Sequence, residues 1–95
     1  MIQIKTTQIY QKWVLKIKDE NLKVRLASRL RRLKAGNFGD VKSVGEGVSE
    51  LRIDYGQGYR IYFTKQGETI VLLLCGGDKS TQEKDIKKAK EMLKC

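Results

Sequence analysis

Residues 48–75, VSELRIDYGQGYRIYFTKQGETIVLLLC, decide the fold of this chain. Apolar and polar residues alternate along most of this stretch, which predicts three consecutive strands at 48–55, 59–65 and 69–75. The third run is apolar along its length, as expected of a central strand that is covered on both faces. Two glycines flank Gln57 and favour a tight hairpin between the first two strands.

Before this stretch the apolar residues recur every three or four positions, which predicts two helices. A short strand at 2–5 leads to Thr6 or Thr7, either of which can cap a first helix with apolar residues at 9, 10, 13, 14 and 17. Asp19 can cap a second helix with leucines at 22, 26, 30 and 33, and Gly36 is placed to end it.

After the strands, Ser80 and Glu83 fit a capping box that opens a last helix, with Ile86, Ala89 and Leu93 facing inward. Residues 1–95 therefore form a single α+β domain with the order β-α-α-β-β-β-α. We expect two N-terminal helices to pack on a curved, mainly antiparallel sheet.

The net charge and the absence of histidine limit the classes of function that this chain can have. The chain has 95 residues with 20 Lys and Arg against 11 Asp and Glu, a net charge of 20 − 11 = +9. This excess favours a polyanionic partner, with nucleic acid ahead of an acidic protein or an anionic membrane. The absence of histidine excludes Ser-His-Asp triads, Cys-His nucleophiles and most zinc sites, and we expect no metal or cofactor.

The positions of the two cysteines and the lengths of the apolar runs bear on where in the cell the protein is found. Cys75 and Cys95 form no CxxC pair, and Cys75 lies in an apolar run, so we expect a buried free thiol rather than a disulfide. The N-terminal residues lack the apolar core of a signal peptide, and no run is long enough to span a membrane. We therefore expect a cytoplasmic protein with no membrane role.

Most of the excess charge lies in residues 1–35, which hold ten basic and two acidic residues, a balance of +8. On the second predicted helix Arg25, Arg29 and Arg32 fall at i, i+4 and i+7, which places them on one stripe. We predict that this stripe binds RNA phosphates. The alternative is an ordinary solvated helix surface.

A second group of polar residues falls on one face of the predicted hairpin. A turn centred on Gln57 places Arg52 opposite Tyr62 and Asp54 opposite Arg60. The shared face then carries Glu50, Arg52, Asp54, Arg60, Tyr62 and Thr64. We predict an anion site at the two arginines, with Tyr62 available to stack on a base. The alternative is cross-strand salt bridging on a solvated face.

The segment GGDKST at 76–81 joins the apolar strand to the last helix. Its glycine pair, the lysine and the start of the helix make an anion-binding junction possible, although the segment lacks Walker A spacing. The alternative is a well-capped turn. Lys79 would come from this junction, and Lys42 would approach from the first strand of the hairpin series.

Two long strings carry a family resemblance. GNFGDVKSVGEGVSELRIDYGQGYRIYF at 36–63 and LLLCGGDKSTQEKDIKKAK at 72–90 closely resemble the addiction-module killer proteins, a HigB-like branch of the RelE/ParE toxin superfamily. WVLKIKD at 13–19 and RLASRLRRLK at 25–34 resemble the two N-terminal helices of that family. The resemblance covers essentially the whole chain and implies a toxin of a bacterial type II toxin–antitoxin pair.

The resemblance also implies a mechanism and partners. RelE-like and HigB-like relatives are ribosome-dependent mRNA endonucleases, and their toxicity is neutralised by an antitoxin that is usually a helix-turn-helix protein. On matching positions Arg52 and Arg60 would stabilise the phosphate and the transition state. Lys42 and Lys79 would transfer protons or add positive charge, and Tyr62 would stack or join the acid–base pair.

Two other functions remain compatible with these residues. ParE relatives use the same scaffold to poison DNA gyrase without chemistry, and a basic domain of this kind can also be a plain RNA-binding module. The chain has no tyrosine near its C-terminus and no histidine, two residue types that relatives place at this site. We therefore rest the expectation of an mRNA endonuclease on Arg52, Arg60 and Lys79.

Overall fold

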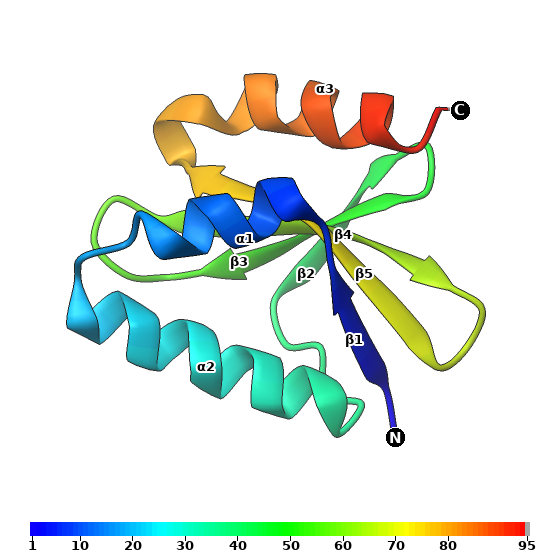
Figure 1. The fold of residues 1–95 in the computed structure, drawn as a ribbon, viewed down its shortest axis with the longest axis horizontal. Helices are drawn as coiled ribbons and strands as arrows, with labels where there is room; N and C mark the ends of the chain where they lie inside the picture. The colour runs from blue at the N-terminus through cyan, green and yellow to red at the C-terminus, as the bar shows by residue number, and fades with distance from the viewer. Residues whose placement is uncertain (95) are drawn as a thin grey trace.

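The computed structural model describes residues 1–94 as a five-stranded sheet with helices on both faces (Figure 1). The elements in chain order are β1 (Gln3–Thr6), α1 (Gln8–Leu15), α2 (Glu20–Lys34), β2 (Val41–Gly45), β3 (Val48–Ile53), β4 (Tyr59–Gln66), β5 (Ile70–Asp78), the 3₁₀ helix η1 (Lys79–Thr81) and α3 (Gln82–Met92). The α+β class and all three predicted helices are confirmed.

The sheet is mixed, with the strand order β1-β5-β4-β3-β2. β1 runs parallel to β5, and the other neighbours are antiparallel. The predicted order β-α-α-β-β-β-α lacked β2, an edge strand of five residues that pairs with β3. β2 is short and ends at Gly45, so it gave too weak an alternation to be recognised in the sequence.

The helix boundaries follow their caps. The side chain of Thr7 accepts a hydrogen bond from the backbone N–H of Tyr10, and Asp19 accepts from the N–H groups of Asn21 and Leu22. Gly36 has φ of +91° just after α2, a left-handed conformation in which glycine is favoured. These starts and this end are the ones that the sequence predicts.

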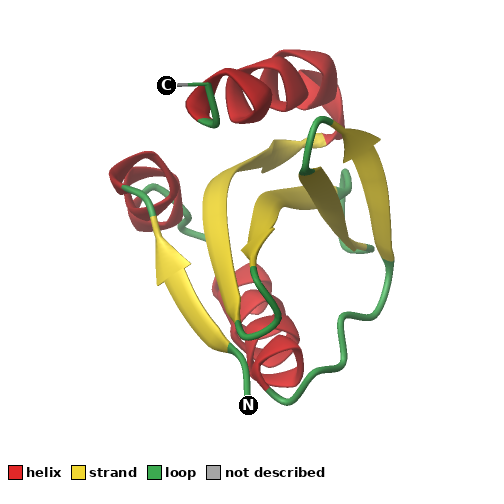
Figure 2. Cartoon of the chain, turned by 90° about the vertical axis from the view of Figure 1, so that its right-hand side faces the viewer, coloured by secondary structure: helices red, strands yellow, loops and turns green. Residues whose placement is uncertain are grey.

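Helices lie on both sides of the sheet (Figure 2), and each face of the sheet carries its own apolar cluster. On one face α1 and α2 pack their apolar residues against the inward side chains of β3, β4 and β5. On the other face α3 packs Ile86 and Ala89 against Val48, Leu74 and Cys75. β5 is therefore covered on both faces, as its apolar run predicts, and α3 covers the face that carries the predicted polar group.

The junction before α3 differs from the prediction. Ser80 was expected to cap α3, but the capping box of this junction belongs to η1: Asp78 accepts from the N–H of Ser80, and the hydroxyl of Thr81 accepts from the N–H of Asp78. α3 begins after Thr81, whose side chain makes no capping hydrogen bond. Asp78 caps η1 because β5 continues to Asp78 and includes Gly76 and Gly77, so the turn begins only after this residue. The two glycines therefore belong to a strand and not to a flexible loop.

The structure also tests the expectations about membrane-spanning segments and about Cys75. Among residues 1–94 no helix combines the length and the apolar character that a membrane span needs. Cys75 is buried as a free thiol, and burial raises its pKa to about 11. Cys95 lies outside the described residues.

Candidate anion-binding site

The site begins with the pairing of β3 and β4. Arg52 lies directly opposite Arg60, Ile53 opposite Tyr59, and the hairpin loop covers residues 54–58. The predicted register, in which Arg52 faced Tyr62, is therefore wrong by two residues. The alternation of faces was unaffected, because a shift of two residues keeps every side chain on its own face.

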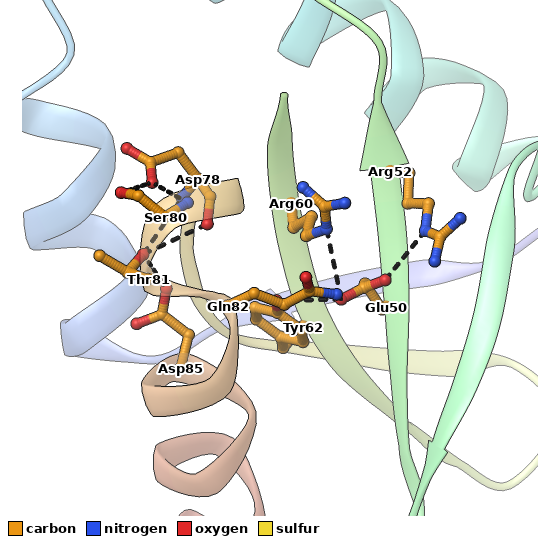
Figure 3. A network of polar contacts seen from close by, with 9 residues as sticks. All are labelled: Glu50, Arg52, Arg60, Tyr62, Asp78, Ser80, Thr81, Gln82 and Asp85. Atoms are coloured by element: carbon orange, nitrogen blue, oxygen red, sulfur yellow. Dashed lines mark hydrogen bonds and ion pairs between the residues drawn. The ribbon is translucent and has the colours of Figure 1, made fainter. Parts of the chain in front are cut away.

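Two like charges directly opposite each other on a sheet repel. Here both arginines turn toward Glu50, which is fully buried beneath them (Figure 3). Nε of Arg52 lies 3.0 Å from Oε1 of Glu50, and Nε of Arg60 lies 3.4 Å from Oε2. The carboxylate therefore offsets the repulsion between the two guanidinium groups.

Glu50 is held by two further donors. The hydroxyl of Tyr62 donates to Oε2 over 3.0 Å, and Nε2 of Gln82, the first residue of α3, donates to the same oxygen over 2.9 Å. Burial alone would raise the pKa of Glu50, but these hydrogen bonds and the neighbouring arginine charges outweigh that effect and lower it. Glu50 is therefore a buried anion with partners from β3, β4 and α3.

The two arginines differ in exposure. The side chain of Arg60 is 12% exposed and that of Arg52 is 37% exposed. Nε of Arg60 is buried without a well-aligned hydrogen bond among the described residues, so charge attraction to Glu50 holds it. Within residues 1–94, no hydrogen bond occupies a terminal guanidinium nitrogen of either arginine. Those nitrogens remain available to an anion.

A hollow of about 320 Å³ opens next to this pair. Its lining includes three cationic side chains and two carboxylates, those of Arg52, Arg60, Lys79, Asp40 and Asp54, together with the backbone-rich hairpin loop. Gly58 lies close to the cations, since a Cβ there would be 3.4 Å from Nη1 of Arg60 and 3.8 Å from Cβ of Lys79. The hairpin thus leaves open space where a larger residue would crowd the arginine.

Only some of the residues predicted to be catalytic lie together in the structure. Arg52, Arg60 and Lys79 meet at the hollow. Lys42 lies on the edge strand β2 opposite Glu50, and it is not among the residues that line the hollow. Tyr62 is fully buried, so the prediction that it stacks on a base is wrong. Burial and the charge of Glu50 raise the pKa of Tyr62, which keeps its hydroxyl a donor.

The predicted RNA-binding arginines on α2 also have different surroundings. Arg29 is half-buried and donates to the backbone carbonyls of Arg52 and Phe38, and burial lowers its pKa. Arg25 and Arg32 are exposed, and the guanidinium of Arg25 lies 4.7 Å from the ring centroid of Tyr55. Arg29 thus connects α2 to β3 through hydrogen bonds, while the side chains of Arg25 and Arg32 are exposed.

Sequence reasoning missed the two residues that organise the site. Glu50 was predicted only to share the polar face of the hairpin with the two arginines, and Gln82 was not singled out. The alternation E-x-R on β3 placed Glu50 beside Arg52, but only the packing of α3 shows that the carboxylate is buried. Among residues 1–94 no three His, Cys, Asp or Glu side chains gather closely enough to share a metal ion, and we assign no metal ligand.

Comparisons with known proteins place the chain among relatives. The family described as Phage derived protein Gp49-like (DUF891) matches residues 12–94. An uncharacterized protein of Haemophilus influenzae is 57% identical over 89 residues, which cover 94% of this chain and 90% of that protein. The residues that match the family include the two arginines, Glu50 and Lys79.

Proposed function

The chain belongs to the Gp49-like family of phage-derived proteins, and from that premise we propose that it is the toxin of a bacterial type II toxin–antitoxin pair that cleaves mRNA. The Gp49-like family is associated with the toxins of toxin–antitoxin systems. One observation carries the proposal: Arg52 and Arg60 lie opposite each other above a buried carboxylate and beside a hollow that Lys79 also lines.

Cleavage of RNA by its own 2′-hydroxyl suits such a site. The 2′-oxygen attacks the adjacent phosphorus, the bond to the 5′-oxygen breaks, and negative charge builds up on the phosphoryl oxygens. The terminal nitrogens of Arg52 and Arg60 would bind these oxygens. A carboxylate fixed on the Nε side of each guanidinium orients the opposite side toward the substrate, which removes a reorganisation cost from the reaction.

Two proton transfers complete the reaction. We assign to the ammonium group of Lys79, which lines the hollow, the donation of a proton to the leaving 5′-oxygen. Asp40 and Asp54 line the same hollow and are the acceptors available for the proton of the 2′-hydroxyl. Lys42 has no part in this mechanism because it does not line the hollow.

The partners follow from this proposal. We propose that the substrate is mRNA, presented by the ribosome, and that a cognate antitoxin neutralises the toxin. An acidic segment of the antitoxin that occupies the hollow would inhibit by occlusion. A toxin–antitoxin complex that leaves Arg52 and Arg60 accessible to solvent would contradict this mode of inhibition.

Expression of the chain alone in a bacterium tests the proposed function. The wild type should arrest growth and stop incorporation of labelled amino acids within minutes, while Arg60→Gln should do neither. Arg31→Gln is the matched control, since Arg31 is an exposed arginine outside the hollow. Growth arrest accompanied by loss of DNA supercoiling, with translation intact, would replace this proposal by a gyrase poison.

A further inference from the structure

A second hollow lies between α2 and the end of β3, and nothing in the proposed chemistry uses it. It measures about 250 Å³ and is lined by Arg25, Ser28, Arg29, Arg32, Ile53 and Asp54. Three of the six are arginines, against a single carboxylate. Ile53 and Asp54 also line the hollow beside Arg52 and Arg60, so the two hollows adjoin at the end of β3.

Arg25 is held in this second hollow before any ligand arrives. The ring of Tyr55 lies under the guanidinium of Arg25, 4.7 Å from its central carbon. The hydroxyl of Tyr55 donates to Asp19 over 2.8 Å, which fixes the ring against the start of α2. A cation held over an aromatic ring loses less freedom on binding an anion than a mobile one does.

Unlike Arg25, Arg29 forms hydrogen bonds to the backbone of the chain itself. Its guanidinium donates to the carbonyl of Phe38 over 3.2 Å and to that of Arg52, so both terminal nitrogens already hold a backbone carbonyl within the chain. The second of these carbonyls belongs to the residue that carries one guanidinium of the catalytic pair. Arg29 therefore fixes the second hollow relative to the first, and Arg25 and Arg32 are left to meet a ligand.

We propose that this second hollow binds a further phosphate of the same single RNA strand that occupies the first. This inference rests on the proposed function and names the path of its substrate. The strand crosses the end of β3 at Asp54, with one phosphate at Arg52 and Arg60 and another at Arg25 and Arg32. Phosphate contacts of this kind fix position along the strand and carry no sequence information.

Binding of uncleavable RNA tests the subsite. The probes are fluorescent 2′-O-methyl oligouridines of 4 and 12 nucleotides, titrated with the full chain at several salt concentrations. Each phosphate contact to a single strand contributes a slope of about −0.7 to the logarithm of affinity against the logarithm of salt. The double variant Arg25→Gln, Arg32→Gln removes the one proposed phosphate contact and should therefore flatten the slope for the 12-mer by about 0.7. Arg31→Gln, a neighbour on the outer side of α2, should leave it unchanged.

Three outcomes would overturn the subsite. The first is a 12-mer slope that the double variant leaves unchanged, or no binding of the 12-mer by the wild type. The second is an equal flattening by Arg31→Gln, which would show a general effect of net charge. The third is a larger loss of affinity for polyglutamate than for RNA in the double variant, which would assign the hollow to an acidic protein partner.

The same variants separate this inference from the proposed function. If the double variant flattens the slope but expression of the wild type leaves mRNA intact, the subsite stands and the cleavage proposal fails. If Arg60→Gln abolishes cleavage while the double variant binds the 12-mer like the wild type, cleavage stands and the subsite fails.

Discussion

Arg52 and Arg60 lie directly opposite each other on antiparallel strands, and each directs its Nε toward the carboxylate of Glu50. The arrangement places two like charges at one register position, where repulsion would normally disfavour them. It also buries a carboxylate completely, at a cost that only its four partners offset. Apolar residues in place of a buried ion pair are often equally or more stabilising, which supports our proposal that this arrangement serves to bind an anion.

Replacing Glu50 should be strongly destabilising. Glu50→Gln removes the charge that both arginines face, and we expect the free energy of unfolding at pH 7 to fall by about 3 kcal/mol. Chemical denaturation measures this change. The control is Glu46→Gln, which removes an exposed carboxylate 3.4 Å from Lys90 and should cost less than about 1 kcal/mol. Equal losses in the two variants would contradict the role of Glu50.

The stability difference between the wild type and Glu50→Gln should depend on pH. The pKa of Glu50 is lower in the folded chain than its ordinary value of 4.5, so its stabilisation is complete above that pH and is lost as pH falls through the folded value. The difference in unfolding free energy between wild type and Glu50→Gln should therefore be constant near neutral pH and shrink below about pH 4.5. A difference that stays constant down to pH 2.5 would show that Glu50 contributes no ionic stabilisation.

Tyr62 should matter for stability and not for chemistry. Tyr62→Phe leaves an acceptor of buried Glu50 without its donor, and we expect a loss of about 1–2 kcal/mol. Because Tyr62 is inaccessible, cuts in a reporter mRNA should keep the wild-type positions and intensities. Abolition of cleavage in a fully folded Tyr62→Phe protein would restore Tyr62 to the acid–base pair.

Gly77 should tolerate no side chain. A Cβ at this position would lie 1.9 Å from Oδ2 of Asp85 and 2.8 Å from Oγ1 of Thr81, so the half-buried pair of Asp85 and Thr81 side chains would have to be displaced or α3 would have to move away from β5. Gly77→Ala should lower the unfolding free energy by about 3 kcal/mol. The control is Gly36→Asn, where an added Cβ would meet no atom within 4 Å beyond its neighbours in the chain. Its φ of +91° strains any side chain, but asparagine tolerates positive φ best, so the loss should be smaller than for Gly77→Ala. Thermal unfolding that is unchanged by Gly77→Ala would contradict the close approach of α3 to β5.

Cys75 should react slowly in the folded protein. Burial raises the pKa of its thiol from 9.0 to about 11, which leaves roughly 100-fold less thiolate at neutral pH. In a Cys95→Ser background, labelling by a disulfide reagent should be slow in buffer and fast in denaturant. Rapid labelling of the folded protein would show that the cluster between α3 and the sheet opens readily.

The local signals in the sequence predicted the helices well. Thr7, Asp19 and Gly36 each act through a few neighbouring residues, so their caps could be identified without the fold. The predicted cap of α3 was wrong, because β5 continues to Asp78 and the short helix η1, which Asp78 caps, comes before α3.

The candidate site depends on long-range packing, and there the sequence was less informative. Glycines flanking Gln57 predicted a hairpin but not the number of residues in its loop, and the register changed with that number. The positions of Arg52 and Arg60 on one face followed from the period of two. The burial of Glu50 and Tyr62 required α3 to cross that face, which no local pattern in β3 or β4 encodes.

The measurement that tests the central claim most directly is primer extension on a reporter mRNA after expression of the chain alone, comparing wild type, Arg60→Gln and Arg31→Gln. Our account predicts cuts at defined positions with the wild type and with Arg31→Gln, and none with a folded Arg60→Gln protein. Intact mRNA in wild-type cells, or unchanged cuts with Arg60→Gln, would contradict it.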